Sequence, residues 1–404
     1  MAGGLVAQRL RRGCNNFTVM GLLQLLLLSL SNTAQAEIRW DVGGFLSQGW
    51  VTSDHNSFYG DSSGSGGSFD FRELGVNGFV QLDPRLKISG QLLSRRAGEI
   101  SDGDPQVDYL FADIFLVQQM QRQAGLRLGR IKNALGFFNE TRDMAFTRPG
   151  LILPQSIYFD QVRELQHSSD GLAFYYRQGN SLGDWQLDLQ YGRLQTGENT
   201  EALFLGNVMN GEFGNSMMAL ARLQFEPQES RWRMGLTRAH LDLPFNPAAG
   251  DPLTKGKLDV EMTVLSLQHN RERLSFTAEA MQVDTRWKNL GILPDHKTLQ
   301  AYYLQMDYRF TDQWQAMVRY DDLVLDKDDR DGSTFNMIHG LPAHLQFAKD
   351  WSLGLRYQPS QSWDLRAEVH RVDGTAWLSK KDNPDGSKMR RRWNMLLVQA
   401  AYRF

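Results

Sequence analysis

The sequence is nearly free of cysteine, and it has no hydrophobic run long enough for a membrane-spanning helix. Its one cysteine, Cys14, precedes an apolar stretch at residues 21–30, within a segment that we interpret as an export signal. The mature chain would then lack cysteine, which excludes disulfides, thiolate metal sites and cysteine nucleophiles. Because only helices and closed barrels satisfy their backbone polar groups in lipid, a membrane location requires a barrel.

The first 36 residues have the order of a secretory signal peptide. Arg9, Arg11 and Arg12 come before the apolar run, and the small-residue stretch Ala-Gln-Ala at 34–36 follows it. The run is far shorter than the roughly 20 apolar residues that cross a bilayer as a helix. We therefore expect a signal peptide at residues 1–36, cleavage after Ala36, and a mature domain at residues 37–404.

Net charge is also small. The formal charge is −2, and removing the three signal arginines lowers it to −5. Such a charge gives no surface for polyanions, so nucleic acid is not an expected partner. The mean hydropathy of −0.44 is compatible with a barrel, in which alternate residues face a polar lumen.

Polar and apolar residues alternate with a period of two along nearly the whole mature chain. Residues 363–370 read Trp-Asp-Leu-Arg-Ala-Glu-Val-His, which places apolar side chains on one face and charged side chains on the other. Many segments have about the 9 to 11 residues that a tilted strand needs to cross a bilayer. The pattern predicts an all-β fold, a transmembrane antiparallel barrel of sixteen strands near 38–50, 70–82, 85–97, 107–119, 123–132, 169–179, 184–194, 217–226, 231–241, 257–270, 272–286, 299–310, 313–325, 347–358, 361–373 and 391–404.

The connections alternate between short and long. Seven short turns, such as Asp83-Pro84 and Thr311-Asp312, separate eight long loops, at 53–69, 98–106, 133–168, 195–216, 242–256, 287–298, 326–346 and 374–390. This asymmetry is typical of bacterial barrels, which have turns in the periplasm and loops outside. Aromatic residues gather beside the short turns and predict an interfacial girdle there, made of Trp40, Trp185, Phe225, Trp232, Phe310, Trp314, Tyr357, Trp363 and Phe404.

The chain ends in an alternating strand, residues 397–404, that finishes with Phe404. This ending resembles the assembly signal by which outer-membrane proteins are handed to the barrel-assembly machinery. With sixteen strands and its longest loop after the fifth, the chain resembles the Gram-negative outer-membrane porin superfamily. Residues 129–136 (Gly-Arg-Ile-Lys-Asn-Ala-Leu-Gly) are similar to the entry to the inward loop in phosphate-selective-type and related porins. The resemblance implies the cell outer membrane, a homotrimer, contact with outer-membrane lipid and lipopolysaccharide, and passage of small hydrophilic solutes.

In such porins the third loop folds into the lumen, and residues 133–168 would do so here. The loop's apolar content argues against free exposure to water, although an extra strand or an outer lid at 150–160 is the alternative. We expect the pore constriction to include Arg130, Lys132, Glu140, Arg142, Asp143, Arg148, Asp160, Arg163 and Glu164, and the lumen wall Arg309, Arg319, Arg356 and Arg366. Opposed charges would orient solutes, whereas the alternative is that they pair and pin the loop to the wall.

Other motifs carry little chemistry. Gly60-Asp61-Ser62-Ser63-Gly64 matches a nucleophile elbow but lies in a glycine- and serine-rich loop without the strand-to-helix context. The aspartates at 326–331 do not have the spacing of a calcium loop, and the eight histidines, among them His269 and His370, show no metal-ligand spacing. We expect a passive channel with no catalytic residues, cofactor or metal. The alternatives are a phospholipase-like barrel enzyme, which needs a serine and a histidine at the outer rim, and a structural or adhesive barrel with a plugged lumen.

Overall fold

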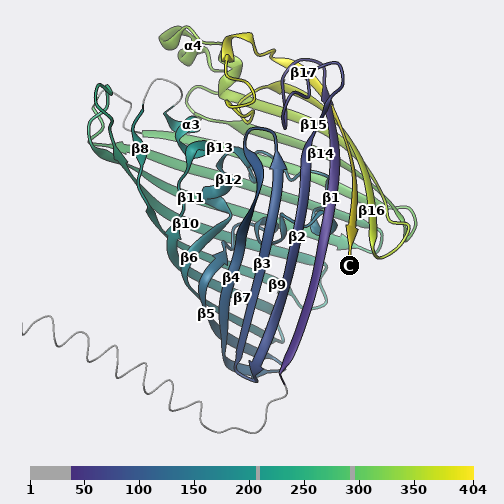
Figure 1. Ribbon diagram of the computed structural model, residues 1–404. Helices are drawn as coiled ribbons and strands as arrows, with labels where there is room; N and C mark the ends of the chain where they lie inside the picture. The colour runs from purple at the N-terminus through teal and green to yellow at the C-terminus, as the bar shows by residue number, and fades with distance from the viewer. Residues whose placement is uncertain (1–37, 206–209, 292–295) are drawn as a thin grey trace, which may run out of the picture.

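The computed structural model describes residues 38–205, 210–291 and 296–404, which form one closed antiparallel barrel (Figure 1). The expected signal peptide and its cleavage site lie outside these residues. Sixteen strands build the wall, and β1 closes it by pairing with β2 and β17. They are β1 Arg39–Ser53, β2 Ser68–Asp83, β3 Leu86–Ala97, β4 Ser101–Gln119, β5 Arg122–Lys132, β6 Ser168–Asn180, β7 Gly183–Leu194, β9 Ser216–Pro227, β10 Trp232–Asn246, β11 Gly256–Arg271, β12 Leu274–Lys288, β13 His296–Arg309, β14 Trp314–Val324, β15 Phe347–Tyr357, β16 Trp363–Gly374 and β17 Arg392–Arg403.

The two-residue alternation separates an apolar outer face from a polar inner face, as predicted. On β15, Trp351 and Leu353 are each 58% exposed. Ser352, which lies between them, and Asp350, which precedes Trp351, are buried. Water cannot satisfy polar groups in the hydrocarbon region, so only apolar side chains are stable on the outer face there. The predicted strand count and strand positions are confirmed.

Aromatic side chains mark both edges of the apolar band. At the turn end, Trp314 stacks on Tyr357 with ring centroids 4.4 Å apart, and Trp363 lies beside Tyr402. The predicted girdle at this rim is therefore present. A second row at the loop end contains Tyr320 and Trp351, whose ring centroids are 4.9 Å apart. Such rings favour the interface, so the two rows bracket the hydrocarbon region.

Several strands are longer at the loop end than the sequence predicts. β4 begins at Ser101 rather than near 107, and β10 continues to Asn246 rather than ending near 241. The hairpins keep their backbone pairing above the aromatic row, where the outer face no longer has to be apolar. The side-chain pattern that marks a membrane strand changes there, and this is why the predicted boundaries fall short.

Above the membrane band, β10 to β12 reverse their polarity. Leu243 and Phe245 point inward and are buried, and the ring of Phe245 packs against Phe213 of the short strand β8 (Glu212–Phe213). On the outside, Lys257 pairs with Asp242 at 2.9 Å. The upper wall therefore encloses a small apolar core, as a soluble sheet does.

The loops carry short helices: η1 Asn139–Thr141, η2 Ala145–Thr147, η3 Asp160–Val162 and α2 Arg163–Gln166 within 133–168, and α3 Glu198–Phe204, α4 Ser333–His339, η4 Ala343–Gln346 and η5 Gly386–Lys388 elsewhere. Of the helices in the described ranges, none has the length and apolar character needed to cross a membrane.

Candidate functional site

Residues 133–168 lie inside the barrel and contact its inner wall on all sides. Hydrogen bonds and ion pairs join the loop to β2, β3, β9, β12, β14 and β16. In a closed barrel, strands as far apart in the sheet as β2 and β12 lie on opposite sides. The loop therefore crosses the lumen. The structure confirms that this loop folds inward. Residues 150–160 lie inside the barrel and do not form an outer lid.

The middle of the loop is fixed to the wall by a buried ion pair. Arg148 donates from Nη1 and Nη2 to the two carboxylate oxygens of Glu73 on β2, at 3.0 and 2.9 Å. Its Nη2 also lies 3.4 Å from Oε1 of Gln399 on β17. Both partners are buried, and a fork-shaped guanidinium matches a carboxylate in this bidentate geometry.

Loop backbone groups around Gly150 bond directly to charged wall residues. Glu368 on β16 accepts from the amides of Leu151 and Ile152, at 2.8 and 3.2 Å. Arg366, also on β16, donates to the carbonyls of Arg148 and Gly150. Arg319 and Arg356 donate to Ile152 O and Phe146 O, at 3.1 and 3.2 Å. Three of the four arginines expected on the lumen wall therefore hold the loop.

The opposite wall holds the start of the loop and Tyr158. Tyr158 donates to Glu279 Oε2 on β12 at 2.6 Å, and the amide of Phe137 donates to Oε1 of the same carboxylate. Arg222 on β9 pairs with Glu140 at 2.7 Å and donates to Gly136 O. Anchors on both sides leave the loop little freedom to move as a unit.

Asp160 is the centre of a second charged group. It accepts from Arg142 Nη2 at 2.9 Å and from Arg95 Nη2 of β3 at 3.1 Å, and the Tyr59 hydroxyl of the first loop donates to it. Burial raises the pKa of the Asp160 carboxyl, but Arg95 and Arg142 outweigh burial and hold it below its usual value. The carboxylate is charged at neutral pH and ties two loops to the wall.

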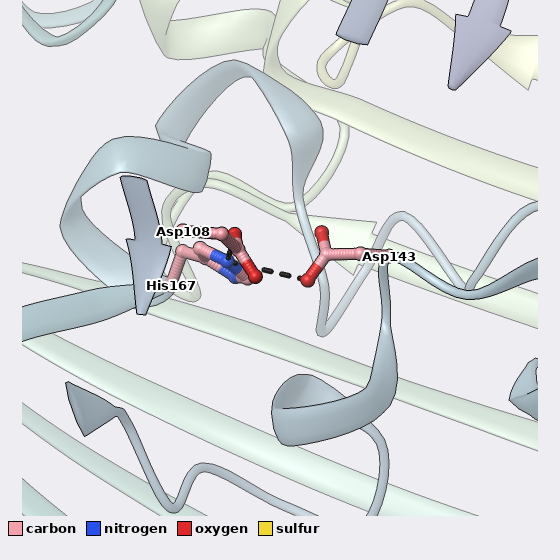
Figure 2. A group of neighbouring side chains, drawn as sticks. All are labelled: Asp108, Asp143 and His167. Atoms are coloured by element: carbon pink, nitrogen blue, oxygen red, sulfur yellow. Dashed lines mark hydrogen bonds and ion pairs between the residues drawn. The ribbon is translucent and has the colours of Figure 1, made fainter. Parts of the chain in front are cut away.

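A third group brings Asp108, Asp143 and His167 together, although they are far apart in the sequence (Figure 2). His167 Nε2 contacts Asp108 and lies 3.3 Å from Asp143 Oδ2. Lys132 Nζ lies 2.9 Å from Asp108 and 2.6 Å from Asp143, and Arg163 contacts the other oxygen of Asp143. The group thus contains two carboxylates, two cations and one imidazole.

A histidine with two carboxylates has the donor set of a metal site, but the charges here are already balanced. Burial, with Arg163 and Lys132 nearby, holds the pKa of His167 well below its usual value, so the imidazole is neutral. Lys132 and Arg163 neutralise Asp108 and Asp143. A divalent ion would have to displace the lysine, and we interpret the group as an ion-pair network that closes the base of the loop.

Six of the nine predicted constriction residues belong to these three groups. Of the other three, Glu140 still holds the loop to the wall through Arg222, whereas Arg130 and Glu164 lie elsewhere. Arg130 lies on the outer side of the wall, in line with the exposed Leu128, and pairs with Asp170 at 2.8 Å. The expectation that Arg130 lines the constriction is corrected, because its position in the alternation points it outward. Glu164 instead accepts from the amides of Gly197 and Thr200 at the start of α3.

The fourth predicted wall arginine, Arg309, lies at the turn end of β13 and is exposed. It shares the inward side of the strand with Gln305 and Asp307, which are buried. Arg309 contributes no contact to the loop among the hydrogen bonds of the described residues.

The wall acids that receive the loop were missed by sequence reasoning. Glu73 and Glu279 stand at inward positions of predicted strands, so the alternation could have identified them. For Glu368, the alternation predicts the charged face of its strand but not its contact with the loop. Asp108 gave no such signal. Gln91 pairs with Tyr109 and Leu92 with Val107, and this bulge turns the extra residue, Asp108, inward.

Outer loops meet over the mouth of the barrel. In the last loop, Lys380 Nζ donates to Leu203 O of α3 at 2.9 Å, and Lys381 pairs with Glu198 at the same distance. Asn383 exchanges hydrogen bonds with Ser57 of the first loop, at 2.9 and 2.8 Å. These contacts cover part of the entrance.

Comparisons with solved structures support the porin architecture. The chain is similar to an anion-selective porin from Comamonas acidovorans (TM-score 0.58, 11% identity, 91% of this chain and 100% of that one). It is also similar to the outer-membrane channel DcaP of Acinetobacter baumannii (0.57, 10%, 92% and 99%). In-vitro folded OmpT of Vibrio cholerae, in a trimer form, gives 0.56 at 9% identity, covering 91% and 99%. These identities show a shared fold.

No curated protein matches the sequence. The family model described as "TonB dependent receptor-like, beta-barrel" matches residues 118–372, which is more than half of the chain and extends from the end of β4 to β16. The matched part contains the loop inside the barrel and most of the wall that holds it. The chain therefore belongs to the TonB dependent receptor-like β-barrel family, and it has the sixteen-stranded outer-membrane barrel fold of the porins.

Proposed function

We propose that the protein is a passive outer-membrane channel for small hydrophilic solutes or ions, driven by the solute's own gradient. The observation that carries the proposal is a sixteen-stranded barrel whose inner wall is polar at membrane depth, where Gln305, Asp307, Arg319 and Glu368 face inward. Barrels of this size enclose an aqueous interior. Proteins of the same fold include a channel and an anion-selective porin.

Residues 133–168 act as the constriction in this proposal. The loop crosses the lumen and is fixed at both ends, so the passage is the space that it leaves beside the wall. The covering outer loops narrow the entrance further. We therefore expect a low conductance for a barrel of sixteen strands, and a preference for small solutes.

The charges on the loop contribute to ion selectivity in two ways: they hold the loop in place, and their electric field reaches the passage. Arg142, Arg148 and Arg163 are buried and paired, so they fix the loop, and their field still reaches the narrow passage because screening is weak near buried charges. Glu140, whose side chain is 33% exposed, is the paired loop charge most open to water. We propose that these residues together set the ion preference.

No specific observation favours either alternative function, the barrel enzyme or the plugged structural barrel. The enzyme alternative needs a serine and a histidine side by side at the outer rim. In the described part of the chain the buried histidines bond to carboxylates instead, His167 to Asp108 and His370 to Asp350. A plugged structural barrel would have the same anchored loop as a channel. The two differ in conductance, because a plugged barrel conducts nothing.

Partners follow from the same proposal. We propose a homotrimer, in line with the trimer form of the similar Vibrio cholerae OmpT. We also propose contact with outer-membrane lipid and lipopolysaccharide through the exposed apolar band, and delivery by the barrel-assembly machinery through Phe404. Chemical cross-linking in native membranes tests the trimer, and a monomer alone would contradict it.

Efflux from proteoliposomes tests the channel directly. Vesicles containing the folded protein should release a small charged solute and retain a large dextran, without any energy source. Vesicles with protein heated to unfolding are the control. If folded protein releases neither solute, the channel proposal fails.

A further inference from the structure

We propose that the outer face of β15, β16, β17 and β1 binds a phosphorylated glycolipid of the outer leaflet, the lipid A portion of lipopolysaccharide. The inference rests on the proposed function only for the orientation of the barrel, with the long loops outside. These four strands are neighbours in the wall (Figure 1). The inference assigns to them a lipid contact that the fold alone leaves spread over the whole wall.

The site begins as a groove of about 640 Å³ on the lipid-facing side of the wall. Its floor and sides are apolar, formed by Trp351 and Leu353 of β15, Val369 of β16 and Leu396 of β17. The first three of these side chains are 47–58% exposed. An exposed apolar hollow that begins at the outer aromatic row and extends below it fits an acyl chain better than it fits water.

A row of polar groups lies at the upper edge of the groove. The strand register places Arg371 of β16 between Trp351 of β15 and Asn394 of β17. One step further toward the loops, Asp373 lies between Lys349 and Arg392. Neighbouring strands are about 4.8 Å apart, so three cations lie within about 10 Å of one another, at headgroup level.

The acidic groups in this region already have partners within the protein. Asp373 pairs with Arg391, at 2.6 Å to Nε. Both oxygens of Asp54, which lines the groove, accept from Asn394, and Asp322 beside Lys349 accepts from the Tyr320 hydroxyl. Over the described residues, Lys349, Arg371 and Arg392 form no ion pair. All three are exposed, so they are available to an anion from outside.

The two layers together identify the ligand class. Phosphate oxygens take charge-assisted hydrogen bonds from arginine, and the apolar groove directly below takes a hydrocarbon chain. Lipid A supplies two phosphates and several chains in the leaflet that this end of the barrel faces. The opposite rim has the aromatic girdle but lies at the turn end, next to the other leaflet.

The test measures lipid retention by the folded barrel in detergent, using native mass spectrometry and diphosphoryl lipid A as the probe. The double variant R371Q/R392Q should bind lipid A about tenfold more weakly, because each lost guanidinium removes a charge-assisted bond. The matched control is R130Q/R238Q, two outward arginines already paired with Asp170 and Glu261, which should change binding less than twofold. Heat-modifiable migration confirms that each variant is folded.

Three outcomes would overturn the assignment. Equal lipid A binding by both double variants would remove the basic row from the site. Equal retention of dephosphorylated lipid A or phosphatidylglycerol would show that the groove takes any lipid. Rapid self-cross-linking of V369C in membranes would show that a second copy covers this face. Conductance is measured on the same variants and should be unchanged, so failure of the channel proposal and failure of the lipid site give different results.

Discussion

At the scale of single residues, the Arg148–Glu73 pair is the contact whose loss should destabilise the barrel most. Arg148→Ala leaves the Glu73 carboxylate buried without its bidentate partner, a change that typically costs about 3–5 kcal/mol. The free energy of unfolding in urea should fall by that order. Arg95, 3.7 Å from Glu73, is then the one remaining ion-pair partner of this carboxylate among the described residues. The double variant E73Q/R148Q should recover part of the loss, because it removes the buried carboxylate as well, and Arg95 keeps its pair with Asp160.

Arg130 is the matched control for this experiment. Its pair with Asp170 is partly exposed at the outer rim, where ion pairs contribute only about 0–1 kcal/mol. Arg130→Ala should therefore leave the unfolding free energy nearly unchanged. Equal losses in the two variants would contradict the view that the buried pairs hold the loop.

Arg142 tests the contribution of loop charge to ion preference. Arg142→Ala removes one positive charge beside the passage and should shift the reversal potential in a salt gradient toward cations. Arg142→Lys keeps the charge and should behave as the wild type does. A shift toward anions, or none in either variant, would show that this buried charge does not act on permeating ions.

Single residues also show where sequence reasoning stops. Wall acids such as Glu279 could be placed on the inner face from alternation, but their partner on the loop could not be predicted. His167 and Asp108 come together only because a bulge in β4 rotates Asp108 and a bend at the end of α2 places His167. Contacts of this kind depend on the folded path of the loop, which no local pattern encodes.

At the scale of elements, deletion of residues 146–155 should raise the single-channel conductance. This segment contains the carbonyl and amide groups that Arg366, Glu368 and Arg319 hold across the lumen. The matched control is deletion of α4 (Ser333–His339), where none of the residues is buried and which lies on the outside. If both deletions fold and neither changes the conductance, the loop is not the constriction.

The last strand provides a separate prediction about assembly. Phe404 closes the barrel with reciprocal 3.0 Å backbone bonds to Gly44, and its ring remains exposed at the turn end. Deletion of Phe404 should reduce the yield of inserted barrel several-fold, as the resemblance to assembly signals implies. Phe404→Tyr keeps an aromatic end and serves as the control. A normal yield without Phe404 would remove it from the assembly signal.

Strands were the most predictable elements because the bilayer imposes one rule on all of them. The predicted bounds of β14 agree with the structure within one residue at each end, since most of the strand lies between the two aromatic rows. The upper ends of β4 and β10 escaped the same rule because they stand above the membrane. Loop helices such as α3 follow no periodicity that the sequence reveals, and they are fixed by contacts with Glu164 and the last loop.

At the scale of the whole molecule, two kinds of wall are joined in one barrel. The membrane part is polar inside and apolar outside, whereas the upper part of β10 to β12 has an apolar interior packed against α3 and β8. The covered entrance and the crossing loop both lie on the route through the barrel. A channel built in this way admits small solutes and excludes large ones, without a change in the wall.

Single-channel recording of the purified protein in a planar bilayer tests the central claim most directly. A passive, loop-restricted channel should give discrete current steps without an energy source, with a reversal potential set by the salt gradient. Steps should be small in the wild type and larger when residues 146–155 are removed. Folded protein that inserts into the bilayer and gives no current, with or without that segment, would contradict the proposed function.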